Sequence, residues 1–150
     1  MLKGIVHVGL TVTDLDRSVA FYRDVLGLAY LGEMEMEGLE TERLFQRKDC
    51  KARGAYLNGS RELAAPPVEL IQFVGQEPER QTGDLFRTSI SELCFFVEDI
   101  DREYRRLKEM GVEFLSEPQT FDSTKYGFGK SRAVYLRDPD GIVLELLQTV

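Results

Sequence analysis

The strongest constraint on the fold of this chain is an internal repeat. His7 and Glu92 stand 85 residues apart, and Asp14 and Asp99 share that spacing. The same register continues, with one residue of slippage, through Asp16 and Asp101, Arg17 and Arg102, Gly27 and Gly111, Leu31 and Leu115, and Glu33 and Glu117. So many matches at strand, cap and turn positions indicate that the two halves are duplicates that build the same structural unit twice.

Each half begins with a strand that is followed by a helix. Apolar and polar residues alternate over residues 4–12, which predicts a strand with His7 on the face opposite its valines. Asp14 is placed to cap a helix with an apolar stripe, and Gly27 can supply the left-handed residue that ends it. The pattern over residues 92–111 repeats this order.

Several strand candidates follow the helix of each half, whereas a helix is expected only once per half. They are Ala29 to Met36, Leu44 to Arg47, Arg53 to Leu57 and Val68 to Val74 in the first half, and Glu113 to Leu115, Ala133 to Arg137 and Val143 to Leu147 in the second. Asp138-Pro139-Asp140-Gly141 is a strong turn signal, which predicts a hairpin from the last two strands.

The expected fold class is therefore α+β, with two similar modules in tandem, each of one helix and several strands. We expect a single domain over residues 1–150, with module 1 at about 1–75, a linker at about 76–87 and module 2 at about 88–150. A chain of this length with 43% hydrophobic residues can build one compact core.

Composition argues against several classes of partner. The formal net charge of −7 disfavours nucleic acid, which requires a basic surface. No stretch approaches the roughly 18 to 20 apolar residues of a membrane span, and no signal peptide is recognisable. Cys50 and Cys94 are far apart and lack metal or redox spacing, so reduced thiols are expected. We therefore expect a cytoplasmic protein that has no nucleic-acid or membrane partner.

Three glutamates interrupt apolar strand segments. Glu69 and Glu145 lie inside apolar runs, and Glu92 opens another. A buried carboxylate is costly unless it is paired, protonated or bound to a metal. His7, the only histidine, adds an imidazole to this set. Taken singly, each has an ordinary alternative, since a strand histidine often packs in a core and a strand glutamate often faces solvent.

The repeat relates these four side chains to one another. His7 and Glu92 occupy equivalent positions, and Glu69 and Glu145 both lie in the last strand of their halves. Duplicated halves would bring them together about a pseudo-twofold axis. One imidazole and three carboxylates suit one divalent ion, with Zn²⁺, Ni²⁺, Co²⁺, Mn²⁺ and Mg²⁺ as candidates. Without a metal, three clustered carboxylates would repel one another.

Residues 7–14, 18–28 and 135–141, followed by Glu145, resemble the vicinal oxygen chelate superfamily. That superfamily includes glyoxalase I, methylmalonyl-CoA epimerase, extradiol dioxygenases, and fosfomycin and bleomycin resistance proteins. The resemblance covers nearly the whole chain. It implies two βαβββ modules that form a curved mixed sheet around a metal-binding cavity, and it implies that the metal ligands are His7, Glu69, Glu92 and Glu145. Members similar to glyoxalase I and the epimerase usually have histidine at the third position, so Glu92 is a departure.

The resemblance also implies a function. Metal-dependent members chelate two neighbouring oxygens of a small hydroxy- or oxo-carbonyl substrate and stabilise an enediolate, in lyase, isomerase or epimerase reactions. Glu145 is then the expected catalytic base, and Glu69 is a ligand or a second proton carrier. The main alternative is a ligand-sequestering protein of the bleomycin-resistance kind, which is not an enzyme. A dioxygenase or a fosfomycin-resistance transferase is disfavoured, because both use two histidines and this chain has only His7.

Arg47, Lys125, Tyr126 and Tyr135 are the candidate substrate contacts. Their ordinary alternatives are a solvated arginine, a plain glycine-containing loop and a packed aromatic residue. The resemblance further implies a homodimer.

Overall fold

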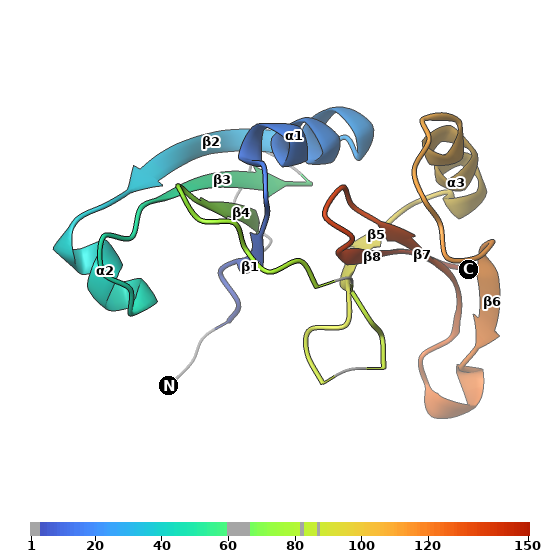
Figure 1. The fold of residues 1–150 in the computed structure, drawn as a ribbon. Helices are drawn as coiled ribbons and strands as arrows, with labels where there is room; N and C mark the ends of the chain where they lie inside the picture. Colours follow the sequence, from blue (N-terminus) through green and yellow to red (C-terminus); the bar gives the residue numbers. More distant parts are fainter. Residues whose placement is uncertain (1–3, 60–66, 82, 87) are drawn as a thin grey trace. The chain divides into compact units, whose positions relative to one another are not determined.

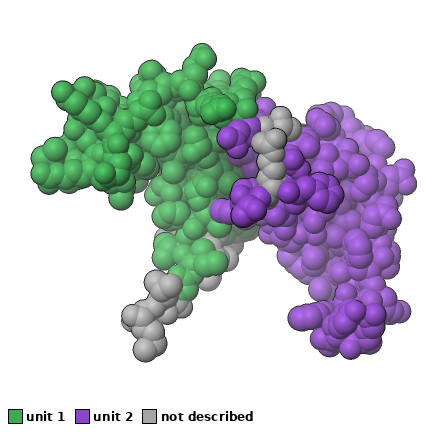
Figure 2. All heavy atoms as spheres, turned by 60° about the horizontal axis from the view of Figure 1, so that its bottom comes forward, with its two compact units in different colours: residues 1–80 green, residues 81–150 purple. Residues whose placement is uncertain are grey.

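The structure is a computed structural model that describes residues 4–59, 67–81, 83–86 and 88–150. The chain forms two compact units, residues 1–80 and residues 81–150 (Figure 2). Each unit contains one four-stranded mixed sheet with few helices (Figure 1). The predicted α+β fold of two βαβββ modules is therefore confirmed.

Unit 1 has the strand order β1-β4-β3-β2, in which β1 runs parallel to β4 and the other pairs are antiparallel. Its elements are β1 (Val8–Thr11), α1 (Leu15–Ala20), the π-helical turn η1 (Phe21–Val25), β2 (Ala29–Met36), α2 (Leu39–Phe45), β3 (Ala52–Asn58) and β4 (Val68–Phe73).

Unit 2 repeats this arrangement in the order β5-β8-β7-β6, again with one parallel pair, β5 with β8. Its elements are β5 (Leu93–Phe96), α3 (Ile100–Glu109), β6 (Gln119–Asp122), the 3₁₀ turn η2 (Thr124–Tyr126), β7 (Lys130–Arg137) and β8 (Val143–Thr149). The predicted hairpin is confirmed, since β7 pairs with β8 and Gly141, at a φ of 84°, closes the turn onto the Asp138 carbonyl.

Matching hydrogen bonds fix the first helix in each unit. Asp14 Oδ1 accepts from the Arg17 amide at 3.0 Å, as the predicted helix cap. Asp99 Oδ1 accepts from the Arg102 amide at the same distance. A glutamine of the last strand also accepts from the first helical amide, Gln72 from Leu15 at 3.2 Å and Gln148 from Ile100 at 3.0 Å. The duplication thus extends to individual contacts.

The core of each unit lies between its sheet and its first helix. In unit 1, Val12, Leu15, Tyr22, Leu57 and Leu70 are fully buried. Leu107, Leu136 and Leu144 are among their counterparts in unit 2. Because side chains alternate along a strand, the residues between these apolar positions project from the opposite face of each sheet. His7, Glu69 and Glu145 belong to that opposite face.

The strand predicted from Leu44 to Arg47 is wrong. Residues Leu39–Phe45 form α2, which begins after Gly38, at a φ of 90°, and ends at Gln46, in the left-handed region at a φ of 53°. The segment contains Leu39, Glu40 and Leu44, whose types have good helix propensity. Alternation over only four residues was too short to distinguish a strand from the end of a helix.

The strand predicted from Glu113 to Leu115 is reduced to a single bridge between Phe114 and Leu136. The edge strand of unit 2 is β6 instead, which pairs antiparallel with β7. All four residues of β6 are exposed, so this strand lacks the alternating burial that would mark it in the sequence. In the part of the chain that the structure describes, no helix combines the length and apolar character needed to cross a membrane.

Candidate metal centre

Unit 1 brings together a triad of His7, Tyr56 and Glu69. His7 Nε2 lies 3.0 Å from Glu69 Oε2, and the Tyr56 hydroxyl donates a hydrogen bond of 2.6 Å to Glu69 Oε1. Strand register positions the triad, because Glu69 pairs with Gly9 across β1 and β4 and with Tyr56 across β3 and β4. Glu69 is buried, whereas the His7 side chain is 43% exposed. The imidazole thus lies at the surface of the sheet, with the carboxylate beneath it.

The Tyr56 hydroxyl holds one oxygen of Glu69 in place. Its hydrogen bond to Glu69, with smaller contributions from lost hydration and the carboxylate charge, raises the pKa of Tyr56 to about 12. Tyr56 therefore remains a hydrogen-bond donor at neutral pH. The other oxygen of Glu69 faces His7, so the carboxylate has a fixed orientation.

The His7–Glu69 pair has a spacing that fits a metal ion. Two donors, each about 2.1 Å from an octahedral ion and at right angles to one another, lie about 3.0 Å apart. The observed separation between His7 Nε2 and Glu69 Oε2 is 3.0 Å. An imidazole nitrogen and a carboxylate oxygen are also the donor types that borderline divalent ions accept. These two residues could therefore occupy adjacent coordination positions of one ion.

Unit 2 has Glu92, Tyr135 and Glu145 at the equivalent positions. Tyr135 pairs with Glu145 as Tyr56 pairs with Glu69, and Cys94 replaces Gly9 beside the glutamate. Lost hydration, the thiol's hydrogen bond to Glu145 and the charges of Glu145 and Glu92 raise the pKa of Cys94 to about 12. Burial and then the same two carboxylates raise the pKa of Tyr135. The carboxylates of Glu92 and Glu145 therefore both lie near Cys94 and Tyr135.

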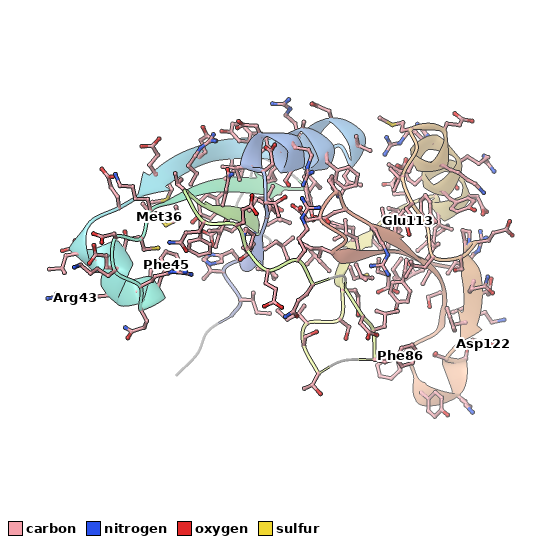
Figure 3. All side chains as sticks on the ribbon, viewed as in Figure 1. Met36, Arg43, Phe45, Phe86, Glu113 and Asp122 are labelled. Atoms are coloured by element: carbon pink, nitrogen blue, oxygen red, sulfur yellow. The ribbon has the colours of Figure 1, made fainter. Side chains whose placement is uncertain are left out.

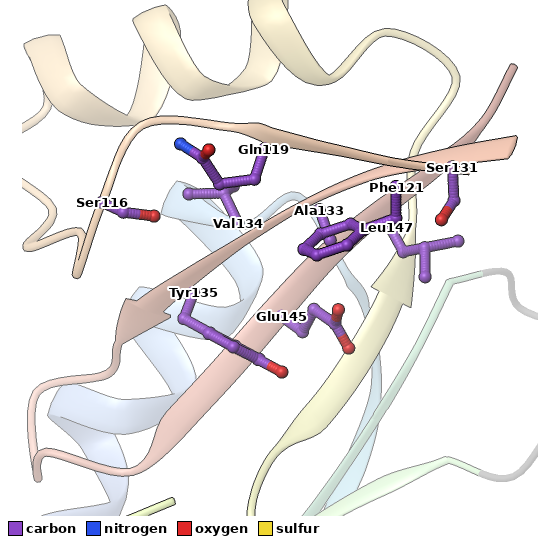
Figure 4. A pocket seen from close by; sticks show the side chains of 9 residues that line it. All are labelled: Ser116, Gln119, Phe121, Ser131, Ala133, Val134, Tyr135, Glu145 and Leu147. Carbon is purple, nitrogen blue, oxygen red and sulfur yellow. The ribbon is translucent and has the colours of Figure 1, made fainter. Parts of the chain in front are cut away.

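A pocket of about 250 Å³ lies beside Glu145 (Figure 4). Tyr135 and Glu145 line it together with residues of β6, β7 and β8. On the corresponding face of unit 1, the side chain of Met36 lies over Gly54. Met36 Cε lies 3.3 Å from where a Cβ on Gly54 would be, at the position equivalent to Ala133.

Phe45 of α2, which is labelled in Figure 3, also packs edge-to-face on Phe73, with ring centroids 5.1 Å apart. In unit 2 the equivalent connection, between β6 and β7, contains the short 3₁₀ turn η2 in place of α2. The two modules thus share a scaffold but present different surfaces on the same face of the sheet.

The structure brings His7 and Glu69 together in unit 1, and it places Glu92 and Glu145 near Cys94 and Tyr135 in unit 2. Among the described residues, no three histidine, cysteine, aspartate or glutamate side chains converge as a metal site would require. The predicted set of four ligands draws on both units, and it stays a prediction.

The other predicted substrate contacts differ in their placement. Tyr135 lines the pocket. Arg47 is exposed after the end of α2, and Lys125 and Tyr126 are exposed in η2, where the Lys125 ammonium lies 4.6 Å from the centre of the Tyr126 ring. Their contact with a substrate stays a prediction.

Tyr56 and Cys94 are the residues that our reading of the sequence missed. Tyr56 and Tyr135 stand 79 residues apart, and so do Arg53 and Arg132, which pair with the equivalent aspartates Asp16 and Asp101. This spacing of 79 residues makes Tyr56 the equivalent of Tyr135. Because Tyr135 pairs with Glu145, the spacing would have indicated that Tyr56 stands beside Glu69.

Comparisons with known proteins agree with this architecture. Residues 4–146 match the family model of the Glyoxalase/Bleomycin resistance protein/Dioxygenase superfamily. A 2-epi-5-epi-valiolone epimerase from Actinomyces sp. is 32% identical over 146 residues, covering 94% of this chain and 76% of the relative. A probable lactoylglutathione lyase from Vibrio parahaemolyticus is 26% identical over 144 residues, covering 96% and 89% of the two chains.

Among solved structures, the glyoxalase family protein APC24694 from Bacillus cereus has the same fold, with a TM-score of 0.81. It is 24% identical in sequence, and the superposition covers 99% of this chain and 95% of that protein. The family match over nearly the full length, the duplicated βαβββ units and the relatives lead to one conclusion. This chain belongs to the glyoxalase/bleomycin resistance protein/dioxygenase superfamily.

Proposed function

We propose that the chain is a metal-dependent enzyme that transfers a proton at the carbon next to a carbonyl group, in a lyase, isomerase or epimerase reaction. The observation that carries this proposal is the direct contact between the His7 imidazole and the Glu69 carboxylate, which are both ligand types of borderline divalent ions. The names of two relatives, an epimerase and a probable lactoylglutathione lyase, support the same reaction classes.

The proposed ligands are His7, Glu69, Glu92 and Glu145. A bound Zn²⁺, Ni²⁺, Co²⁺, Mn²⁺ or Mg²⁺ would supply a Lewis acid that makes the proton next to the carbonyl easier to remove. Glu92 gives the set three carboxylates and one imidazole, a donor set that favours harder ions more than a site with two histidines does.

The two glutamates of the last strands have different surroundings, and this difference supports different roles. Glu69 has one oxygen bound by Tyr56 and the other beside His7, which suits a fixed ligand. Glu145 lines the pocket and accepts a hydrogen bond from the Cys94 thiol, which is a weak donor. Glu145 can therefore take a proton from a substrate in the pocket and return it, with Glu69 as the second candidate carrier.

The test is exchange of substrate protons with solvent deuterium. Purified protein loaded with each candidate metal is incubated in D₂O with a panel of hydroxy- and oxo-carbonyl compounds, and exchange is followed by proton NMR. We expect metal-dependent exchange that Glu145→Gln abolishes, while Glu109→Gln, at an exposed position of α3, leaves it unchanged.

Absence of exchange with every metal and compound would contradict the proposal. Ligand binding without exchange or any requirement for metal would instead indicate a sequestering protein of the bleomycin-resistance kind, the second function that the family includes.

We also propose that the chain acts as a homodimer in the cytoplasm. Phe96, on edge strand β5, is 66% exposed, and Phe86 is 97% exposed, which leaves apolar surface for a second copy to cover. Cys50 and Cys94 are both free thiols, as suits a reducing compartment. Sedimentation equilibrium should give twice the mass of the chain, and a monomer at micromolar concentration would contradict the homodimer.

A further inference from the structure

In unit 2, Glu145 lies between a cysteine and a tyrosine. Strand β8 has β5 on one side and β7 on the other, and the register pairs Glu145 with Cys94 of β5 and with Tyr135 of β7. Residues that are paired across neighbouring strands project from the same face of a sheet. The thiol and the phenol hydroxyl therefore flank the carboxylate on its two sides.

The same positions in unit 1 have a different arrangement of donors. Glu69 of β4 lies between Gly9 of β1 and Tyr56 of β3. Gly9 has no side chain, and the hydrogen bond to Glu69 comes from the Tyr56 hydroxyl at 2.6 Å. A Cβ on Gly9 would lie 3.7 Å from Glu69 Oε2, which is the oxygen beside His7. Glycine at this position thus leaves that oxygen open to the imidazole.

In unit 2 the hydrogen bond to the glutamate comes from the opposite neighbour. The Cys94 thiol, which is free and exposed, donates to Glu145. The Tyr135 hydroxyl forms no hydrogen bond with any residue that the structure describes. The tyrosine that is engaged by the glutamate in unit 1 therefore has an equivalent in unit 2 whose hydroxyl is still available as a donor.

The pocket lies on the tyrosine side of Glu145. Tyr135 and Glu145 both line it, whereas Cys94 does not (Figure 4). A donor from β5 can hold the carboxylate without entering the pocket. A donor from β7, as in unit 1, would direct the Tyr135 hydroxyl to Glu145 and away from a bound ligand. The change of donor thus leaves the Tyr135 hydroxyl and one carboxylate oxygen for a ligand.

We propose that Cys94 is a positioning residue for Glu145, whose carboxylate it holds from β5, so that the Tyr135 hydroxyl can donate a hydrogen bond to an oxygen of the substrate. The role of Tyr135 toward a substrate rests on the proposed function. The contact between Cys94 and Glu145 involves unit 2 alone and can be measured without a ligand.

Infrared spectroscopy of the full chain without added metal tests this contact. The Cys94 S–H stretching band, assigned by its loss in Cys94→Ser, should move to higher frequency in Glu145→Gln, because an amide oxygen is a weaker acceptor than a carboxylate. Glu109→Gln should leave the band in place, and the buried free thiol of Cys50 provides an internal reference. A Cys94 band that does not move in Glu145→Gln would overturn the proposal.

The effect on proton transfer is measured with the metal-loaded protein and the compound that exchanges fastest with solvent deuterium. Cys94→Ala removes the donor and should lower kcat about tenfold, with little change in KM. Cys94→Ser keeps a hydroxyl donor at the same position and should restore the rate. A wild-type kcat in Cys94→Ala, or equal losses in the alanine and serine variants, would contradict the positioning role.

Tyr135→Phe tests whether the tyrosine hydroxyl serves the substrate. This variant should lower kcat on the order of 100-fold, because it removes a donor to an oxygen that gains charge during the reaction. It should leave the Cys94 S–H band unchanged, since the tyrosine does not hold the carboxylate. A wild-type kcat in Tyr135→Phe would refute the donor role of its hydroxyl.

Direct binding of the thiol to the metal is the competing arrangement. If Cys94 were a ligand, the Co²⁺-loaded protein would show a sulfur-to-cobalt charge-transfer band that Cys94→Ser removes. We expect no such band, and its presence would overturn the proposal.

The positioning role and the proposed function fail in different ways. A Cys94 band that depends on Glu145, without deuterium exchange by any metal-loaded form, would uphold the contact and contradict the proposed function, together with the role of Tyr135. Deuterium exchange with a Cys94 band that is independent of Glu145 would leave the proposed function standing and overturn the positioning role.

Discussion

At the scale of single residues, the centre of unit 1 is organised by Tyr56. Its hydroxyl donates a hydrogen bond to Oε1 of Glu69, so Oε2 is the carboxylate oxygen that lies beside His7. The sequence predicted His7 and Glu69 as ligands from their places in the internal repeat and from the resemblance to the vicinal oxygen chelate superfamily. It did not reveal Tyr56, since a tyrosine in a strand usually packs and its role here comes from the pairing of β3 with β4.

Replacement of Tyr56 tests its role as a support for the metal ligand. Tyr56→Phe removes the hydrogen bond to Glu69 and keeps the ring, so metal affinity should fall on the order of 10- to 100-fold. Tyr135→Phe, at the equivalent position of unit 2, should have a smaller effect. Competition with a chelating fluorescent dye measures both affinities. Equal affinities for wild type and Tyr56→Phe would show that Tyr56 does not orient the ligand.

At the scale of the elements, the sequence correctly predicted the helix caps and strands that depend on short stretches of neighbouring residues. The caps of α1 and α3 and the strands β2 and β8 follow from side-chain periodicity, capping residues and glycines. It failed for α2 and β6, where short segments gave no clear period. The pocket was also missed, because its lining combines side chains from three neighbouring strands and from the segment before β6.

The duplicated helix caps should make equivalent contributions to stability. Asp14→Ala and Asp99→Ala each remove the side-chain acceptor of a first-turn amide, and each should lower the free energy of unfolding by about 1 kcal/mol. Urea unfolding followed by circular dichroism measures both losses. A lower free energy of unfolding in one variant and no change in the other would show that the two modules do not share this stabilising helix cap.

The Asp101–Arg132 pair links α3 to β7 and predicts a dependence of stability on pH. The Arg132 guanidinium holds the pKa of Asp101 below its ordinary value, mainly through their hydrogen bonds. Because the pKa is lower in the folded than in the unfolded chain, the pair stabilises the fold above about pH 4. This contribution is lost as the pH falls through the folded value.

Asp101→Asn should therefore be less stable than the wild type at pH 7, and the difference should shrink toward pH 3. The urea midpoints of both proteins at the two pH values measure this change. Glu109→Gln is the control, since Glu109 is an exposed carboxylate of the same helix with no recorded ion pair in the described structure. A difference that stays constant with pH would contradict the assignment to Asp101.

At the scale of the whole molecule, duplication explains both what the two units share and how they differ. Both have the same strand order, helix caps and glutamine contacts. They differ at His7 and Glu92, and at Gly9 and Cys94, which are the positions around the two glutamates. The common scaffold could be predicted because it repeats, whereas the consequences of these differences could not be predicted from the repeat.

The central claim is that these residues hold a catalytic divalent metal, and metal stoichiometry tests it most directly. The chain is purified without chelator, loaded separately with Zn²⁺, Ni²⁺, Co²⁺, Mn²⁺ and Mg²⁺, and measured by equilibrium dialysis with elemental analysis. We predict close to one tightly bound ion per chain for at least one of these metals, and loss of that ion in His7→Ala. No tight binding of any of them, or full binding in His7→Ala, would contradict the proposed centre.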